Sequence, residues 1–86
     1  MSRYLVELYL PATEARDLGA AMTRARSAAK AASSNGARIR CLRSIFVPED
    51  ETWFLLYEAP TAAAVSHAVE QAALPCGRVV AAVAPQ

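Results

Sequence analysis

Four polar side chains fall on one side of three predicted strands, where most of their neighbours on that side are apolar. They are Glu7, Arg40, Ser44 and Glu58. Polar groups set among apolar ones would line a pocket if a second surface covered them. Two carboxylates could then bind a cation, or one could act as a base toward a ligand. A structural ion pair between Arg40 and a carboxylate, fixing the register of a dimer, is the alternative, because such pairs imitate functional sites.

Arg43 is a fifth candidate ligand-binding residue, because it interrupts the alternation of the second predicted strand. It has the parity of Ile39, Cys41, Ile45 and Val47, which we predict to face the core. A β-bulge near Arg43, a side chain that reaches water along its stem, or a functional role would each explain the interruption. Arginines on an edge strand also block the pairing of one sheet edge with another. These explanations stay open at the level of sequence.

Few residues are suited to metal or cysteine chemistry. His67, the single histidine, falls near Glu70 on the polar side of a predicted helix, where metal ligation would need residues from another chain. Cys41 and Cys76 are 35 residues apart in a chain without an export signal, so we expect reduced thiols. The cysteines lack the paired spacing of metal chaperones, and one histidine leaves no obvious base for a cysteine nucleophile. No phosphate loop, zinc-binding helix motif or nucleophile elbow occurs, and we predict no catalytic residue.

The chain is short and nearly neutral. It has 86 residues, a mass of 9.2 kDa and a formal charge of +1, and 20 of its residues are alanine. The near-neutral charge and the lack of a glycine-punctuated aromatic motif argue against nucleic-acid binding. Glu7 would interrupt the apolar core of a signal peptide, and no apolar run reaches the ~18 residues of a membrane span. We therefore predict a cytoplasmic protein with neither nucleic-acid nor membrane partners.

Changes in the period of the apolar residues predict strands that alternate with helices. The predicted strands are Arg3–Leu10, Arg38–Val47, Trp53–Glu58 and Val79–Ala84, and the helices begin at Thr13 and Thr61. Thr13 and Thr61 are the expected N-caps, and Gly36 suits the left-handed position after the first helix. The turn Pro48–Glu51 makes the second and third strands an antiparallel hairpin. The resulting order of elements is βαββαβ.

This order predicts an α+β fold of the ferredoxin-like type, as a single domain over residues 1–86. Right-handed crossovers place both helices on one face of an antiparallel sheet ordered 4-1-3-2. The other face has no cover from this chain, although it carries large apolar side chains: Leu5, Tyr9, Leu42, Phe46, Phe54 and Leu56. So short a chain buries only about 60% of its unfolded surface, and we predict a homodimer that covers the open face.

Several segments carry a resemblance to a known family: Tyr4-Leu5-Val6-Glu7, Ser44, Leu56-Tyr57-Glu58-Ala59-Pro60 and Leu74-Pro75. In them the chain resembles a family of small bacterial ferredoxin-like proteins, long catalogued as a domain of unknown function, in which nickel binding has been described. The resemblance covers residues 3–83 and implies the fold, the dimer and nickel as a possible ligand. Members often carry His, Ser and Tyr where this chain has Arg43, Ser44 and Ile45, and Cys where it has Leu55. The donors best suited to nickel are therefore missing.

Two functions from different classes remain. The first is a non-catalytic binding protein, a dimer that holds a metal ion or a small molecule between its sheets. With the metal donors partly lost, its pocket would suit an anionic or neutral ligand held by Arg40. The alternative is a small dimeric α/β-barrel enzyme, an isomerase, cyclase or cofactor-free oxygenase, with its substrate in the same cavity. A buried acid or base in an open cavity would favour the enzyme.

Overall fold

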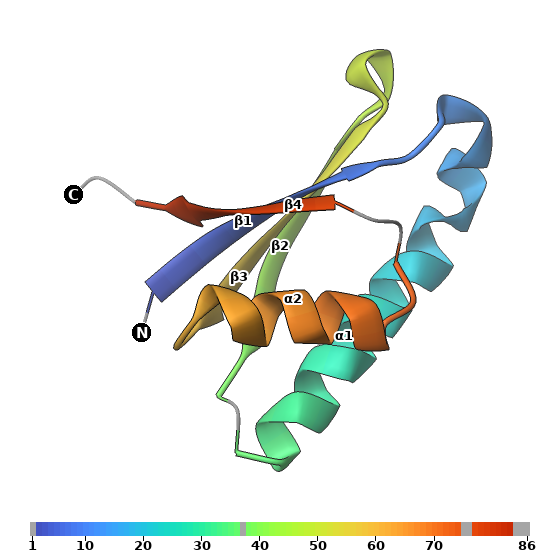
Figure 1. The fold of residues 1–86 in the computed structure, drawn as a ribbon. Coiled ribbons are helices and arrows are strands. Elements are labelled where there is room, and N and C mark those ends of the chain that lie inside the picture. Colours follow the sequence, from blue (N-terminus) through green and yellow to red (C-terminus); the bar gives the residue numbers. More distant parts are fainter. Residues whose placement is uncertain (1, 37, 75–76, 84–86) are drawn as a thin grey trace.

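Strands and helices follow one another along the chain in the order that the periodicity predicts. The computed structural model describes residues 2–36, 38–74 and 77–83. Its elements are β1 (Ser2–Tyr9), the 3-10 helix η1 (Ala12–Asp17), α1 (Leu18–Ser34), β2 (Arg40–Val47), the 3-10 helix η2 (Pro48–Asp50), β3 (Thr52–Ala59), α2 (Ala62–Gln71) and β4 (Gly77–Ala82). The strands form one antiparallel sheet in the order β2-β3-β1-β4, which confirms the predicted order (Figure 1). This α+β architecture is compatible with a ferredoxin-like fold.

The hydrophobic core lies between the sheet and the two helices. Figure 1 shows α1 and α2 on the same side of the sheet. The strands supply the large side chains of the core and the helices supply mostly alanine, which lets α1 lie close to the sheet. The core includes Val6, Leu8, Trp53, Leu55 and Tyr57 from the strands, Ala21, Ala25 and Ala29 from α1, and Val65, Ala68 and Val69 from α2. The molecule measures 19 Å along its shortest axis, the depth of one sheet and one helix layer.

The start of the first helical segment differs from the prediction that Thr13 is its N-cap. Pro11 occupies the N-cap position of η1, and its carbonyl accepts a hydrogen bond from the Glu14 amide at 2.8 Å. Because proline fixes its own backbone angle, the 3-10 turn begins there, and Thr13 already lies inside it. The end of α1 follows the prediction: Gly36 has a φ of 91° and donates its N–H to the Ser33 carbonyl at 3.0 Å.

The second helix begins as the sequence predicts. Thr61 has extended backbone angles, and its hydroxyl accepts a hydrogen bond from the Ala64 amide at 3.1 Å. This bond satisfies one of the free N–H groups of the first turn, the arrangement typical of a threonine N-cap. The residues predicted to face the core are all buried: Val65, Ala68, Val69 and Ala72.

A β-bulge interrupts the pairing of β2 with β3 between Cys41 and Arg43. Cys41 lies opposite Tyr57, which is fully buried under the helices, and Arg43 lies opposite Leu56, on the other side of β3. The bulge therefore explains why Arg43 interrupts the alternation, as one of the predicted explanations proposes. One extra residue reverses the parity of everything that follows it in the strand.

The predicted facing of β2 beyond the bulge is consequently wrong. Ser44 and Phe46 turn toward the helices, opposite the buried Leu55 and Trp53, instead of away from them. Ile45 and Val47 take the side on which Ser44 and Phe46 were expected. Leu42 lies within the bulge and is half-buried.

Two further predictions concern the cysteines and the membrane. Cys41 is half-buried and carries a free thiol. Cys76 lies outside the described residues, so the absence of a disulfide between the two cysteines stays a prediction. Within the described ranges, no helix combines the length and the apolar character needed to cross a membrane.

Candidate functional site

The side of the sheet that faces away from the helices, called the open face here, has an apolar centre and charged margins. Cross-strand pairing sets its side chains in rows. One row runs Arg43, Leu56, Leu5, Val80, and the next runs Ile45, Phe54, Glu7, Arg78. A third row at one end runs Arg40, Glu58, Arg3, Ala82, and Val47, Thr52 and Tyr9 form the other end.

A shallow pocket of about 120 Å³ lies in the centre of the open face. Its walls come from three strands and belong to the two central rows: Leu5, Arg43, Ile45, Phe54 and Leu56. Ile45 is 59% exposed, although an isoleucine in a chain of this size would normally be buried. The pocket therefore consists of four apolar side chains and one arginine.

Glu7 forms the shortest ion pair of the open face. Its Oε2 lies 2.6 Å from Arg78 Nη2 in an ion pair and accepts a hydrogen bond from Arg78 Nε at 2.8 Å. The pair depends on Gly77, because a methyl group there would overlap the Glu7 carbonyl oxygen and the Leu8 side chain. Glycine lets β4 approach β1 closely, and Arg78 is thereby placed opposite Glu7. A carboxylate held in this way is already neutralised by its own chain.

Glu58 lies between two arginines at one end of the open face. Its Oε2 is 4.0 Å from Arg3 Nε, and its Oε1 is 4.0 Å from Arg40 Nη1. The Arg40 side chain is 71% exposed, so this contact contributes little to stability. Arg43 is different, because it makes no ion pair with any of the described residues. Four arginines against two glutamates give the open face a net charge of +2, whereas the whole chain carries +1.

The structure brings together four of the five candidate ligand-binding residues: Glu7, Arg40, Arg43 and Glu58 share the open face. Ser44 lies on the opposite side of the sheet, where its Oγ accepts a hydrogen bond from Trp53 Nε1 at 2.5 Å. Sequence reasoning missed Arg3, Arg78 and Ile45. Arg3 has the same parity as Glu7 and could have been found, but Arg78 lies before the predicted start of the last strand.

The residues of the open face do not fit a nickel ion. Glu7 and Glu58 are separated by the apolar row of Leu5 and Leu56, and each is neutralised by arginine. Leu55 is fully buried on the helix-covered side, so donors at positions 45 and 55 would point to opposite faces. No group of three or more His, Cys, Asp or Glu side chains able to hold a metal occurs among the described residues.

A thiol and a phenol meet on the helix-covered face. Tyr57 is fully buried, and its hydroxyl has no hydrogen-bond partner of good geometry among the described residues. Burial raises the pKa of Tyr57, and its neighbour Cys41 raises it further. Burial also raises the pKa of the Cys41 thiol, an effect that the Arg26 charge and the Tyr57 hydroxyl partly oppose. Cys41 is therefore a protonated, weakly nucleophilic thiol at neutral pH.

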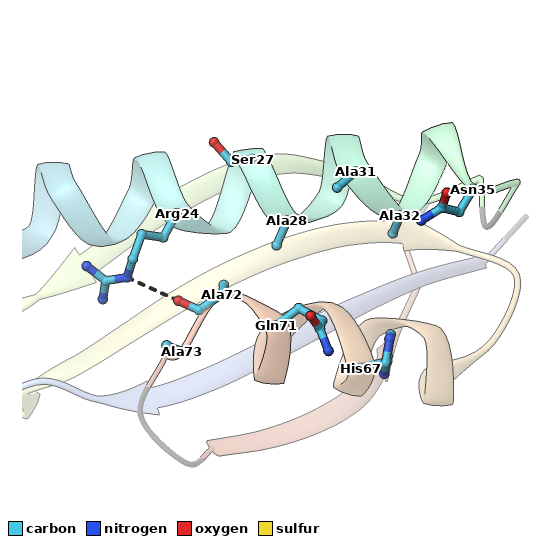
Figure 2. Close-up of a pocket in the computed structure, with 10 residues that line it drawn as sticks. All are labelled: Arg24, Ser27, Ala28, Ala31, Ala32, Asn35, His67, Gln71, Ala72 and Ala73. Carbon is cyan, nitrogen blue, oxygen red and sulfur yellow. Dashed lines mark hydrogen bonds between the residues drawn. The ribbon is translucent and has the colours of Figure 1, made fainter.

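A groove of about 530 Å³ lies between α1 and α2 (Figure 2). It exists because its walls are largely alanine, which leaves space between the two helices. Figure 2 shows Arg24 reaching from α1 to the end of α2, where its Nε donates to the Ala72 carbonyl at 3.1 Å. His67 and Gln71 form the polar part of the α2 wall (Figure 2). Its lining holds no carboxylate and no cysteine. The Ser27 hydroxyl and the His67 imidazole come from different helices, and no hydrogen bond joins them.

Comparisons with known proteins leave the family open. No protein-family model matches the chain, and no curated protein or solved structure matches it at a significant level. The resemblance to the nickel-binding family therefore stays a prediction.

Proposed function

We propose that this chain is a small non-catalytic binding protein that works as a homodimer, with two open faces stacked and a small ligand held between them. The observation that carries the proposal is the apolar centre of the open face, which no part of the described chain covers. Exposed apolar surface of this kind, ringed by polar residues, is typical of an interaction site. A second copy presents a surface of the same size and the same apolar centre.

The area of the open face is close to what a stable dimer needs. Three strands of eight residues and one of six form it. With strands about 4.8 Å apart and a rise of about 3.3 Å per residue, the face projects an area of about 500 Å² per copy. Protruding side chains make the accessible area larger than this projection. Two copies therefore approach the roughly 1,200 Å² of total buried surface at which stable interfaces begin.

The charges of the open face leave its centre free for stacking. Arg40 and Arg78 belong to the two edge strands, and both side chains are more than two-thirds exposed. They can stay hydrated at the rim of a dimer while the apolar side chains of the central rows are buried. A polar rim around an apolar centre is the usual anatomy of a protein interface.

Binding is favoured over catalysis by the state of the two carboxylates. A general base must be free to take a proton from a substrate within hydrogen-bond reach. Glu7 instead accepts a hydrogen bond from Arg78 and forms an ion pair with it, and Glu58 lies between two arginines. The pocket itself is lined by apolar side chains and Arg43, which is a permanent cation.

Sedimentation of the wild-type chain and of two variants tests the dimer. We expect a dimer at roughly 50 μM for the wild type, a monomer for Ile45→Glu and a dimer for Ala20→Glu. Ile45 projects from the open face, whereas Ala20 is an exposed residue of α1, so the same charge is added on different sides. A monomeric wild type, or a dimer that survives Ile45→Glu, would overturn the proposed assembly.

A further inference from the structure

We infer that the ligand held at the open face is a small apolar carboxylate, with its carboxylate on Arg43 and its hydrocarbon part in the central pocket. This inference rests on the proposed function and names the class of ligand. It also changes the expected anchor, because the sequence alone favoured Arg40 for this role.

Arg43 is the arginine of the open face that is available to bind an anionic ligand. Arg78 is paired with Glu7, and Arg3 and Arg40 flank Glu58. Arg43 is the remaining arginine of the open face, and it forms no ion pair with the described residues. Arg43 is exposed on a single copy, but in the proposed dimer its guanidinium would lie beside the apolar residues of the pocket. An anion at that position would remove the cost of covering a cation without a partner.

The surroundings of Arg43 indicate what the rest of the ligand is. Arg43 begins the row that continues through Leu56, Leu5 and Val80, and it lines the pocket together with Ile45 and Phe54. A ligand whose charged group reaches Arg43 would therefore lie with its body against apolar side chains. The site therefore combines one planar guanidinium, which donates hydrogen bonds, with a surface of apolar side chains.

The size of the pocket limits the ligand to a few carbon atoms. The pocket measures about 120 Å³ on one copy, and a dry cavity of about 150 Å³ is known to hold benzene. A short aliphatic chain fits the pocket of one copy, and an aromatic ring would project from this smaller, open pocket toward the second copy. A nucleotide or a folded cofactor is too large for it, since sites for such molecules usually have about 300–1,000 Å³.

A monoanionic carboxylate suits this site better than a phosphate does. The guanidinium fork matches both groups in geometry. A phosphate, however, is usually bound by several donors, such as additional cations or the free amides of a helix N-terminus. The pocket has a single cation and otherwise apolar walls. One guanidinium balances the charge of one carboxylate, and the apolar walls then bind the hydrocarbon.

Calorimetric titration of the full chain with benzoate tests the inference, with benzyl alcohol as the neutral analogue and inorganic phosphate as the second anion. We expect benzoate to bind with a dissociation constant below ~1 mM. We expect binding at least ten times weaker for each of the other two probes. Phosphate binding as tight as benzoate, benzyl alcohol binding as tight as benzoate, or no saturable benzoate binding would overturn the inference.

Two matched variants locate the anchor. Arg43→Met keeps most of the aliphatic stem and removes the charge, and we expect it to weaken benzoate binding at least tenfold. Arg40→Met makes the same change at a position on the same strand and face, and we expect less than a threefold effect. Arg43→Lys keeps the charge but removes the planar guanidinium, and we expect it to weaken benzoate binding by an intermediate factor. This variant also tests the anchor if Arg43→Met folds poorly. An effect that follows Arg40 instead of Arg43 would contradict the assignment.

Sedimentation of the same samples separates this inference from the proposed function. A dimer that fails to bind benzoate would disprove the ligand class and leave the assembly intact. A monomer that binds benzoate through Arg43 would support the ligand class and disprove the assembly. Nuclear magnetic resonance shift changes at Ile45, Phe54 and Leu56 would place benzoate on the open face. Changes confined to His67 and Gln71 would place it in the α1–α2 groove and overturn the inference.

Discussion

Trp53 donates its indole N–H to the Ser44 hydroxyl across the β2–β3 hairpin, at 2.5 Å, on the side of the sheet that the helices cover. Trp53 is fully buried, so this N–H has no access to water in place of the serine. The bond exists only because the bulge before Arg43 turns Ser44 toward the helices. Ser44 therefore stabilises the core of the protein, whereas Arg43, its neighbour in β2, lies on the open face.

Replacing Ser44 by alanine tests this role. We expect Ser44→Ala to lower the free energy of unfolding by about 1–2 kcal/mol, because a buried donor loses its acceptor. Benzoate binding and the sedimentation coefficient are expected to stay unchanged, since Ser44 lies on the far side of the sheet. Urea unfolding measures the change in the free energy of unfolding. The control is Ser66→Ala, at an exposed position of α2, for which we expect a change within about 0.5 kcal/mol. Loss of ligand binding in Ser44→Ala without loss of stability would contradict the assignment.

The order of the strands and most helix ends could be predicted because they depend on local signals. Thr61 and Gly36 act where a capping threonine and a left-handed glycine are expected. Thr13 misled the prediction, because Pro11 two residues earlier begins the helical turn by itself. In each of these cases, short-range backbone chemistry decides the outcome.

The candidate site could be predicted only in part, because it depends on pairing between distant strands. In the sequence, Arg43 interrupts the alternation and so indicates a bulge in the second strand. The sequence of this strand alone does not show whether the extra residue lies before or after Arg43. The facing of Ser44 and Phe46 follows from that choice, and it was therefore predicted wrongly. The partner of Glu7 could not be found either, since the register of β4 against β1 depends on the contact at Gly77.

The half-buried Cys41 and the fully buried Tyr57 make the protein sensitive to alkaline pH. Burial raises the pKa of the Cys41 thiol above its ordinary value of 9.0 and that of the Tyr57 phenol above 10.0. At pH 7 both groups are protonated in the folded and unfolded states, so they add no pH dependence there. Above pH 9 the unfolded chain releases protons that the folded chain retains. We therefore expect the free energy of unfolding to fall as the pH rises above 9.

Urea unfolding between pH 7 and pH 11 measures this slope. We expect Tyr57→Phe and Cys41→Ala each to flatten it, and Tyr9→Phe, at a side chain that is 60% exposed, to serve as the control. At pH 7, Tyr57→Phe is expected to be as stable as the wild type or up to about 1 kcal/mol more stable, because it removes a buried hydroxyl without a partner. A stability that stays constant up to pH 11 would show that the pair is not buried in solution.

Nickel binding is the property on which the family resemblance and the side chains disagree. The resemblance implies a nickel site, but Glu7 and Glu58 lie in different rows and are each neutralised by arginine. A cation beside Arg43 would also be repelled by the guanidinium, by about 1 kcal/mol or more at close range even with strong screening. Carboxylates alone are a poor donor set for nickel, which binds imidazole and similar ligands better. We expect calorimetric titration of the metal-free protein with nickel to show no stoichiometric site tighter than ~10 μM.

Variants of the two glutamates decide how a positive nickel titration would be interpreted. Glu7→Ala removes the partner of Arg78 and Glu58→Ala that of Arg3 and Arg40, so each raises the net positive charge of the open face. If nickel binds only nonspecifically, both variants are expected to bind it as weakly as the wild type or more weakly. His67→Ala, in the groove between the helices, shows whether any weak binding comes from the single histidine instead. A stoichiometric site near ~1 μM that either glutamate variant abolishes would mean that the carboxylates leave their arginines to bind the metal. In that case the open face would hold a cation, and the assignment of a carboxylate ligand to Arg43 would be wrong as well.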